Sequence, residues 1–388
     1  MSITFHILIP FVVSLLAAIW IFPKILHIAL VKNIVDNPDA RKLQRVPVPV
    51  LGGVAVMFGI LVALSVCHIY VDCGNLFSIV LAMIVMLYVG TIDDIMNLSP
   101  GIRFLIEIAV TLMLMYSCGY SIDHFHGLWG LHTVPAFVSV PLTVVTVVGL
   151  INAINLIDGV DGYSSGYCIM ACSIFGLCFY ISGDISMVLL ASVCVASLIP
   201  FFFHNVFGRT TKMFIGDGGT LVMGVVMSIF VLNVLKHDTS CTLYETWGMG
   251  LVPFSLAVLA IPVFDTVRVM STRILRGCSP FHPDKTHLHH LFISMHYSHI
   301  GAALSILMLN LLIILAWYFS YKLGASVDVQ FYVVLAMGLL STFGFYGFMR
   351  WCERRDNAFW HFACRLGESS HFERKGLFCW LQRMMDGE

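Results

Sequence analysis

Long apolar segments alternate with short polar breaks along almost the whole chain. A hydrocarbon core about 30 Å thick needs roughly 20 apolar residues per helix, and about eleven segments approach that length. They centre near Phe11, Val62, Met83, Val110, Val145, Ile174, Val193, Val226, Leu259, Leu312 and Met337. No large soluble domain fits between them. The pattern therefore predicts an all-α polytopic membrane protein.

The composition supports this fold class. The 388 residues are 59% hydrophobic and only 11% charged, with a mean hydropathy of +0.91. Soluble domains carry about 25% charged residues, so a soluble enzyme is excluded. The net charge of -1 gives no sign of a nucleic-acid partner. Membrane lipids are the expected surroundings.

Lysine and arginine are distributed unevenly between alternate loops. The richer set comprises Lys32, Arg41, Lys42, Arg45, Arg103, Arg209, Lys212, Arg273, Arg276, Lys285, Arg350, Arg354, Arg355, Arg365, Arg374, Lys375 and Arg383, whereas the other set holds little beyond Lys236 and Lys322. The positive-inside rule makes the richer side cytoplasmic. We therefore expect the N-terminus outside and the C-terminus in the cytoplasm, which agrees with an odd number of spans.

The two ends of the chain differ in character. Met1 to Leu30 lacks a basic n-region and a cleavage site, so it is interpreted as a first span. Residues 1–349 form the expected membrane domain. Residues 350–388 mix basic and aromatic residues, which suits an amphipathic segment at the membrane surface or a partly disordered basic tail. Cys73 and Cys241 fall in predicted outside loops, but the sequence does not place them within bonding distance.

An acidic pair, Asp93 and Asp94, ends one apolar segment. Adjacent carboxylates repel, so both stay ionised only near a cation or a basic group. A helix-end cap would normally need a single aspartate. The pair therefore favours a functional site over a cap, and Asn97 stands where related acidic motifs end in a third aspartate.

A second polar cluster is Asn152, Asn155, Asp158 and Asp161, at spacings of three. If the helix continues far enough, the first three share one stripe. A polar helix end facing water is the alternative. Carboxylate and amide ligands repeated in this way favour a metal or nucleotide site.

Three further stretches belong to the same set of loops. Asp217 lies among glycines at the start of a span, where backbone N–H groups attract phosphate. The histidines at 287, 289 and 290 lack zinc-protease spacing and, with Arg273 nearby, suit phosphate oxygens. Lys42 belongs to a basic loop that could clamp an anion. Coincidental histidines and purely topogenic basic residues are the alternatives.

Taken in order, these motifs resemble the bacterial polyprenyl-phosphate N-acetylhexosamine-1-phosphate transferase family, and within it the undecaprenyl-phosphate GlcNAc-1-phosphate transferase branch. The matching motifs are Asp36-x-Pro-x-x-Arg-Lys, Asp93-Asp94, Asn155-x-x-Asp158-x-x-Asp161, Gly216-Asp217-Gly-Gly-Thr, Pro262-x-x-Asp265-Thr and Ser279-Pro-Phe-x-Pro-Asp-x-x-His-x-His-His. Two departures are Asn97, where the hexosamine branch commonly has Asp, and Gln44, where His is common.

The resemblance implies a ten- or eleven-helix fold, often homodimeric, in the bacterial inner membrane. Its cytoplasmic groove would join a UDP-N-acetylhexosamine to a polyprenyl phosphate, release UMP and start an envelope glycan such as lipopolysaccharide, O-antigen or capsule. Mg²⁺, or Mn²⁺ in its place, would neutralise the phosphates.

The resemblance also suggests a role for each motif. Asp217 is the expected principal metal ligand, while Asp93 orients or deprotonates the lipid phosphate and Asp94 supports it and the metal. The expected substrate-binding residues are Lys42, Asn155, Asp158, Asp161, Arg273, His287, His289 and His290.

Other readings of the same residues stay open. The nearest is phospho-N-acetylmuramoyl-pentapeptide transferase, whose loop before the histidines differs. An intramembrane aspartyl protease could pair Asp217 with Asp158 or Asp161, but would not need the basic and histidine loops. An ion-coupled transporter would place its charges at the bilayer midplane and not at span ends.

Overall fold

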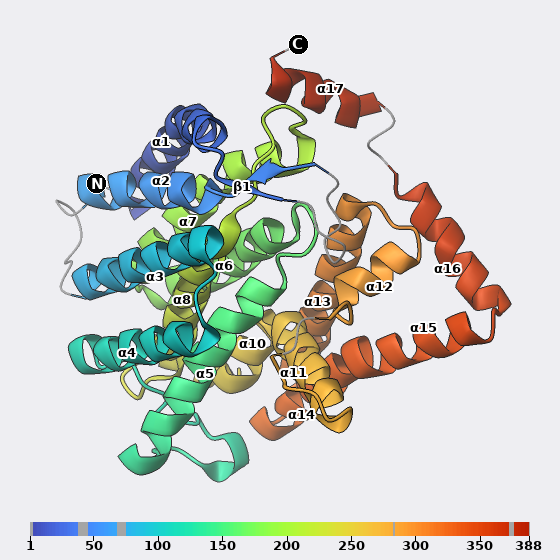
Figure 1. The fold of residues 1–388 in the computed structure, drawn as a ribbon. Helices are drawn as coiled ribbons and strands as arrows, with labels where there is room; N and C mark the ends of the chain where they lie inside the picture. Colours follow the sequence, from blue (N-terminus) through green and yellow to red (C-terminus); the bar gives the residue numbers. More distant parts are fainter. Residues whose placement is uncertain (1–2, 38–45, 68–74, 282–283, 372–375, 388) are drawn as a thin grey trace.

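The computed structural model describes residues 3–37, 46–67, 75–281, 284–371 and 376–387, and most of these are helical (Figure 1). The helices are α1 (Ile3–Val31), α2 (Gly52–Cys67), α3 (Leu76–Met96), α4 (Pro100–Cys118), α5 (Ala136–Leu156), α6 (Tyr163–Ser182), α7 (Ile185–Phe207), α8 (Gly216–Leu235), α9 (Thr242–Glu245), α10 (Leu251–Val258), α11 (Ala260–Leu275), α12 (Leu288–Ser294), α13 (His299–Lys322), α14 (Val327–Leu339), α15 (Phe345–Arg354), α16 (Ala358–Ser369) and α17 (Gly376–Asp386). A short 3₁₀ turn (Leu128–Gly130) and a π-helical turn (Leu340–Gly344) complete the helical elements.

The apolar helices account for every predicted segment. Nine helices of the described chain are long and apolar enough to cross a membrane, and α10 with α11 forms a tenth candidate that bends by 74°. Helix α2 is a shorter apolar helix and coincides with the remaining segment. The predicted multi-pass helical fold is confirmed.

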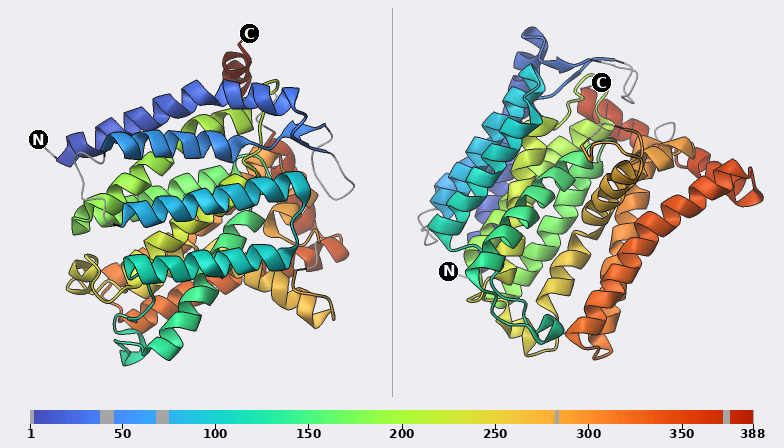
Figure 2. Two further views of the ribbon diagram at one scale, coloured as in Figure 1. Left: turned by 60° about the vertical axis from the view of Figure 1, so that its left-hand side comes forward. Right: turned by 60° about the horizontal axis from the view of Figure 1, so that its bottom comes forward.

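Successive long helices run in opposite directions because their connections are short. Figures 1 and 2 show α1 to α4 side by side in this up-and-down arrangement. As a result the C-terminal ends of α3, α5 and α7 meet the N-terminal ends of α4, α6 and α8. The described residues of the sequence motifs therefore gather at one end of the bundle.

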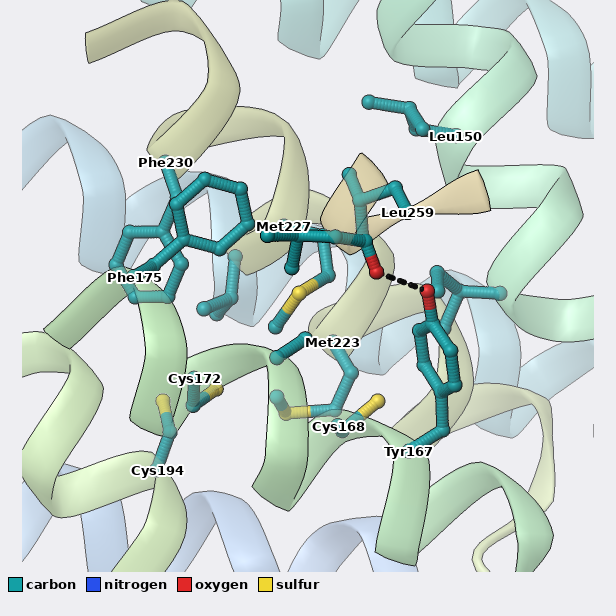
Figure 3. Close-up of a cluster of buried hydrophobic side chains, with 14 of the residues drawn as sticks. Leu150, Tyr167, Cys168, Cys172, Phe175, Cys194, Met223, Met227, Phe230 and Leu259 are labelled. Carbon is teal, nitrogen blue, oxygen red and sulfur yellow. Dashed lines mark hydrogen bonds between the residues drawn. The ribbon is translucent and has the colours of Figure 1, made fainter. Parts of the chain in front are cut away.

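Helix α8 is the centre of the bundle, and the span it contributes is completely buried. Around it, Phe175 and Phe230 pack with ring centroids 5.6 Å apart, together with methionines of α8 (Figure 3). Cys168 and Cys172 lie in this core as small hydrophobes, as the sequence predicts.

The bend between α10 and α11 is stabilised by side chains from other helices. A helix break leaves backbone groups without partners, which is costly in an apolar interior. The Tyr167 hydroxyl donates to the carbonyl of Val258 at 2.6 Å, as Figure 3 shows, and the Asn310 amide donates to the same oxygen at 3.1 Å. Asn310 also accepts from the N–H of Ile261 at 2.9 Å. The break is therefore a built feature.

The cysteines form no disulfide among the described residues. Cys241 is buried, and its Sγ lies 3.9 Å from Sγ of Cys178 as an unbonded thiol. Cys73, considered above as its partner, lies outside the described residues. Their pairing stays untested.

A two-stranded antiparallel sheet helps to position the start of α8. Strand β1 (Val35–Asp36) pairs with β2 (Val48–Pro49). At the end of β2, the carbonyl of Pro49 accepts from the N–H of Phe214 at 2.7 Å, and the N–H of Gly53 donates to the carbonyl of Ile215 at 2.8 Å. These bonds fix the approach to α8, and so the place of its first turn.

The chain after residue 350 is helical where the structure describes it. The expected boundary at 349/350 falls inside α15, and α16 and α17 follow (red in Figure 1). Several large apolar side chains of these helices are exposed, among them Phe359, Phe362 and Trp380. Both helices are amphipathic, as expected for a segment at a membrane surface. Their location at such a surface stays a prediction.

Candidate active site

An arginine joins the two acidic motifs. Asp93 lies in the last turn of α3, and Asp217 lies in the first turn of α8. Arg103, in the first turn of α4, reaches both: its Nη1 lies 3.2 Å from Oδ2 of Asp93 and 3.5 Å from Oδ2 of Asp217. Residues more than a hundred positions apart thus share one cation.

The end of α5 supplies amides to the same centre. Asn155 Nδ2 donates to Oδ1 of Asp217 and to Oγ1 of Thr220, both at 2.9 Å. Asn152 accepts from Arg103 at 2.7 Å and donates to the buried Glu107 at 2.6 Å. The family resemblance implies substrate contacts for Asn155, which stay a prediction; in the structure its amide holds the carboxylate of Asp217.

Helix α5 ends at Leu156, so the predicted polar stripe on the helix ends before Asp158. Asn152 and Asn155 lie in the last turns of the helix, whereas Asp158 and Asp161 lie in the connection that follows. The glycines at 159 and 162 explain the end of the helix, because they favour a tight turn.

Arg103 is one of the site residues that the sequence analysis did not identify. It served there only as a basic loop residue that sets orientation. One signal was present: Glu107, four residues further on, is a carboxylate inside an apolar segment, and such a group needs a partner. Their side chains approach to 3.5 Å.

A cavity of about 390 Å³ opens at this end of the bundle. Its polar lining consists of Asp36, Asp94, Asp158, Asp161, Asn205, Lys212, Asp217, His289, His290 and His299. The predicted residues at 94, 158, 161, 217, 289 and 290 therefore come together around one space. Asn155 and Asp93 stand beside it through their contacts to Asp217 and Arg103.

The two acids of the α5–α6 connection have opposite electrostatic settings. Burial, with the nearby carboxyls of Asp217 and Asp161, raises the pKa of Asp158 to about 7, against a hydrogen bond from Ser164 that lowers it. Burial also raises the pKa of Asp161, but His299 and Lys212 outweigh it and hold the pKa below its usual value. Asp161 is therefore the firmly ionised member.

The histidine loop is anchored from behind by α11. Asp265 bonds Arg268 at 2.6 Å and Nδ1 of His287 at 3.0 Å. Arg273 forms a two-pronged pair with Asp284, with its closer contact at 2.8 Å. His287 and Arg273, predicted to hold diphosphate, are buried in these contacts and are not among the residues that line the cavity.

Of the three histidines at 287, 289 and 290, His289 and His290 reach the cavity. Gly159 permits this, because a Cβ there would lie 2.1 Å from Nε2 of His289. Burial and the neighbouring histidines lower the pKa of His289 well below its usual value. Burial, with His287 and Lys285, lowers that of His290 to about 4. Both imidazoles are neutral at pH 7, so they donate hydrogen bonds and do not supply full charge.

Asp94 has a defined structural task. Its Oδ1 accepts from the N–H of Asp217 at 3.1 Å and its Oδ2 from the N–H of Gly218 at 3.4 Å. It therefore supplies acceptors for the free amides at the start of α8. Lys42, predicted to bind substrate, lies outside the described residues.

The donor set suits a cation that is shared with substrate. The described residues hold no group of three or more His, Cys, Asp or Glu side chains arranged for a metal. Five carboxyl groups nevertheless line the cavity, against a single lysine. Mg²⁺ is commonly held by one or two carboxylates with water and substrate phosphates. Asp217 and Asp94 fit that mode, whereas a closed structural metal site does not.

The fold and this one-sided acidic centre define a multi-pass membrane enzyme. A family model described as glycosyl transferase family 4 matches residues 76–235, which contain the acidic centre from Asp93 to Asp217. The chain is 29% identical over 302 residues to the probable undecaprenyl-phosphate N-acetylglucosaminyl 1-phosphate transferase of Bacillus subtilis (strain 168), covering 76% of this chain and 79% of that protein.

Two enterobacterial relatives give the same picture. The undecaprenyl-phosphate alpha-N-acetylglucosaminyl 1-phosphate transferase of Salmonella typhi is 27% identical over 269 residues, covering 68% of this chain and 70% of that protein. That of Escherichia coli (strain K12) is 28% identical over 266 residues, covering 67% and 69%. The chain is thus similar to curated phosphoglycosyl transferases over about two thirds or more of its length, and the predicted resemblance is confirmed.

Proposed function

We propose that the protein transfers N-acetylglucosamine 1-phosphate from UDP-N-acetylglucosamine to undecaprenyl phosphate and releases UMP. The observation that carries the proposal is the meeting of Asp217, Asp158, Asp161, Lys212 and His290 around one cavity at the ends of the membrane helices. The names of the similar transferases supply the sugar and the lipid. The product would start an envelope glycan.

The reaction joins two anions. An oxygen of the lipid phosphate attacks the sugar-bearing phosphorus of the UDP sugar, forming one P–O bond. The bond from that phosphorus to the bridging oxygen breaks, and the electron pair leaves with UMP. Catalysis of this kind depends mainly on positioning and charge neutralisation.

The residues divide between the two substrates. Asp93, held by Arg103 beside the cavity, orients the lipid phosphate or accepts its proton. Asp158 and Asp161 bind the nucleotide sugar through its hydroxyl and N–H groups. His289 and His290 donate to diphosphate oxygens, and Lys212 adds positive charge. Asp265 and Arg273 act behind them by fixing the histidine loop.

Asp217 and Asp94 would hold Mg²⁺, or Mn²⁺, together with the diphosphate. When bound, the cation would neutralise phosphate charge and polarise the P–O bond. The carboxylate of Asp217, held by Asn155 at Oδ1 and by Arg103 at Oδ2, is the protein's contribution.

We further propose that the site faces the cytoplasm in the bacterial inner membrane, with the N-terminus outside, and that the protein is a homodimer. The charge bias of the loops supports the orientation; the homodimer rests on the family resemblance alone. The acids lie at helix ends and not at mid-span, which disfavours a transporter. The histidine loop, for which a protease has no use, disfavours a protease.

The test is release of UMP by protein purified in detergent. We expect UMP from UDP-N-acetylglucosamine only when undecaprenyl phosphate and Mg²⁺ or Mn²⁺ are both present. A panel with UDP-N-acetylgalactosamine and UDP-N-acetylmuramoyl-pentapeptide identifies the sugar. If no UDP sugar yields UMP with lipid and metal, the proposed function is wrong.

A further inference from the structure

Asp161 is held by two basic groups that come from different parts of the chain. Nζ of Lys212, in the α7–α8 connection, lies 2.6 Å from its Oδ2. Nδ1 of His299, the first residue of α13, lies 2.8 Å from the same oxygen. All three side chains line the cavity. The position of this carboxylate therefore depends on where the α7–α8 connection and the start of α13 place Lys212 and His299.

The end of α17 holds the first of these loops. The carboxylate of Asp386 accepts from the backbone N–H groups of Arg209 at 3.0 Å, Thr210 at 2.9 Å and Thr211 at 3.3 Å. It also accepts from the hydroxyls of both threonines, at 2.9 and 3.3 Å. The next residue is Lys212. Figure 1 shows α17 lying beside this connection at the site end of the bundle.

These donors match an ionised carboxylate. Partial burial raises the pKa of Asp386, but the amides and hydroxyls of residues 209–211 outweigh it and hold the pKa below its usual value. Three convergent N–H groups form an anion-binding concavity of the kind that binds phosphates elsewhere. Here a side chain of the same molecule occupies it.

The residue that ends α16 holds the second loop. Ser370 Oγ accepts from the N–H of Ser298 at 3.0 Å, and Ser298 Oγ donates to the carbonyl of Ser370 at 2.7 Å. Ser298 also caps α13, accepting from the N–H of Gly301 at 3.1 Å. Both serines are buried. The next residue after Ser298 is His299.

We propose that α16 and α17, with Ser370 and Asp386 as positioning residues, act as a strap that positions Asp161 through Lys212 and His299. Each strap contact lies directly before one of the two groups that hold Asp161, although the contacts are 16 residues apart in the strap. A tail that served only as a surface anchor would need neither contact. The strap thereby tunes binding of the nucleotide sugar, which rests on the function proposed above.

The experiment compares Asp386→Ala, Ser370→Ala and their combination with the full-length wild-type protein in the UMP-release assay. We expect each single change to raise KM for UDP-N-acetylglucosamine about fivefold to tenfold, with kcat changed less than twofold and KM for undecaprenyl phosphate unchanged. The charge-matched control is Glu368→Gln, in the same strap, whose exposed pair with His296 at 3.6 Å contributes little. It should behave as wild type.

A second background distinguishes positioning from general loosening. In Asp161→Asn protein, the neutral amide no longer responds to Lys212 and His299. The strap changes should therefore add no further increase in KM, because groups that act through one another are not additive. Unfolding temperatures in detergent, measured for every variant, identify proteins that fail to fold.

Two results would overturn the strap. One is that KM for the UDP sugar stays at the wild-type value in both single variants. The other is that the same increase appears on top of Asp161→Asn. In both cases the proposed function still holds if the wild-type protein is active. If the wild-type protein releases no UMP, the proposed function is wrong, and so is the role of the strap in sugar binding.

Discussion

Asp94 accepts a hydrogen bond from the backbone N–H of Asp217, with Oδ1 and N 3.1 Å apart. One acidic motif thus holds the start of the helix that carries the other. Because the peptide N–H of Asp217 is fixed, its side chain has few directions available, and Asn155 and Arg103 select one. The neighbouring Asp93 stays available for a partner of its own. This arrangement explains why two adjacent aspartates are needed where one would cap a helix.

Replacing the charge of Asp217 tests the proposed metal ligand. Asp217→Asn keeps the side-chain volume and the oxygen that accepts from Asn155, but removes the carboxylate charge that holds a hard cation. We expect turnover to fall by about 10²- to 10³-fold, with normal insertion and purification. The assay is UMP release over a Mg²⁺ titration. Asn97→Asp, which restores the commoner family residue, should keep substantial activity. Wild-type rates for Asp217→Asn at limiting Mg²⁺ would move the metal elsewhere.

The ionisation of Asp158 predicts a pH dependence. With a pKa of about 7, the carboxyl is protonated below that pH and ionised above it. The ionised carboxylate accepts hydrogen bonds through both oxygens, from a hydroxyl and an N–H of the sugar nucleotide. The protonated carboxyl uses one oxygen as a donor and therefore binds these groups less well. KM for the UDP sugar should therefore fall about tenfold as the pH rises from 6 to 8. Asp158→Asn should flatten this dependence. A profile that is the same in both proteins would assign the ionisation to another group.

The proposed orientation can be tested with single cysteines in a cysteine-free background. Ser99→Cys and Phe281→Cys place exposed thiols at the site end, and Leu131→Cys and Thr246→Cys place them at the opposite end. An impermeant thiol reagent added to intact cells should label only the second pair. After the cells are opened, all four should react. Labelling of Ser99→Cys from outside would reverse the proposed orientation.

The close approach of α3 to α8 makes a specific stability prediction. A Cβ on Gly90 would lie 2.4 Å from the backbone of Asp217, whereas a Cβ on Gly101 would meet nothing within 4 Å. Gly90→Ala should lower the unfolding temperature and activity together, because the first turn of α8 must move. Gly101→Ala should be neutral or slightly stabilising, by about 0.4 to 1 kcal/mol at most. Thermal unfolding in detergent compares the two. Equal behaviour would mean that the contact can relax.

The sequence predicted the spans well because apolar length is a local property of the chain. It also grouped Asp217, Asp158, Asp161 and His290 correctly, since alternate loops of a membrane bundle share a face. It could not assign Arg103, because basic loop residues usually indicate only orientation, and the partner that distinguishes this one lies on α8. Arg273 and His287 show the reverse: their residue types suggested phosphate binding, but pairing with Asp284 and Asp265 depends on the fold of α11.

Variants of Arg103 can distinguish an effect on stability from an effect on catalysis. It approaches the buried Glu107 to 3.5 Å and also links Asp93 to Asp217. Arg103→Ala should destabilise the protein by about 3 to 5 kcal/mol, because it removes the positive charge beside the buried Glu107 carboxyl and leaves it only the amide of Asn152. Adding Glu107→Gln removes that unpaired acid, so the double variant should recover most of the lost stability. Activity should not recover, since Asp93 and Asp217 still lack their shared cation. Unfolding temperatures and UMP release measured on the same preparations decide the matter: recovery of both together would make Arg103 a purely structural residue.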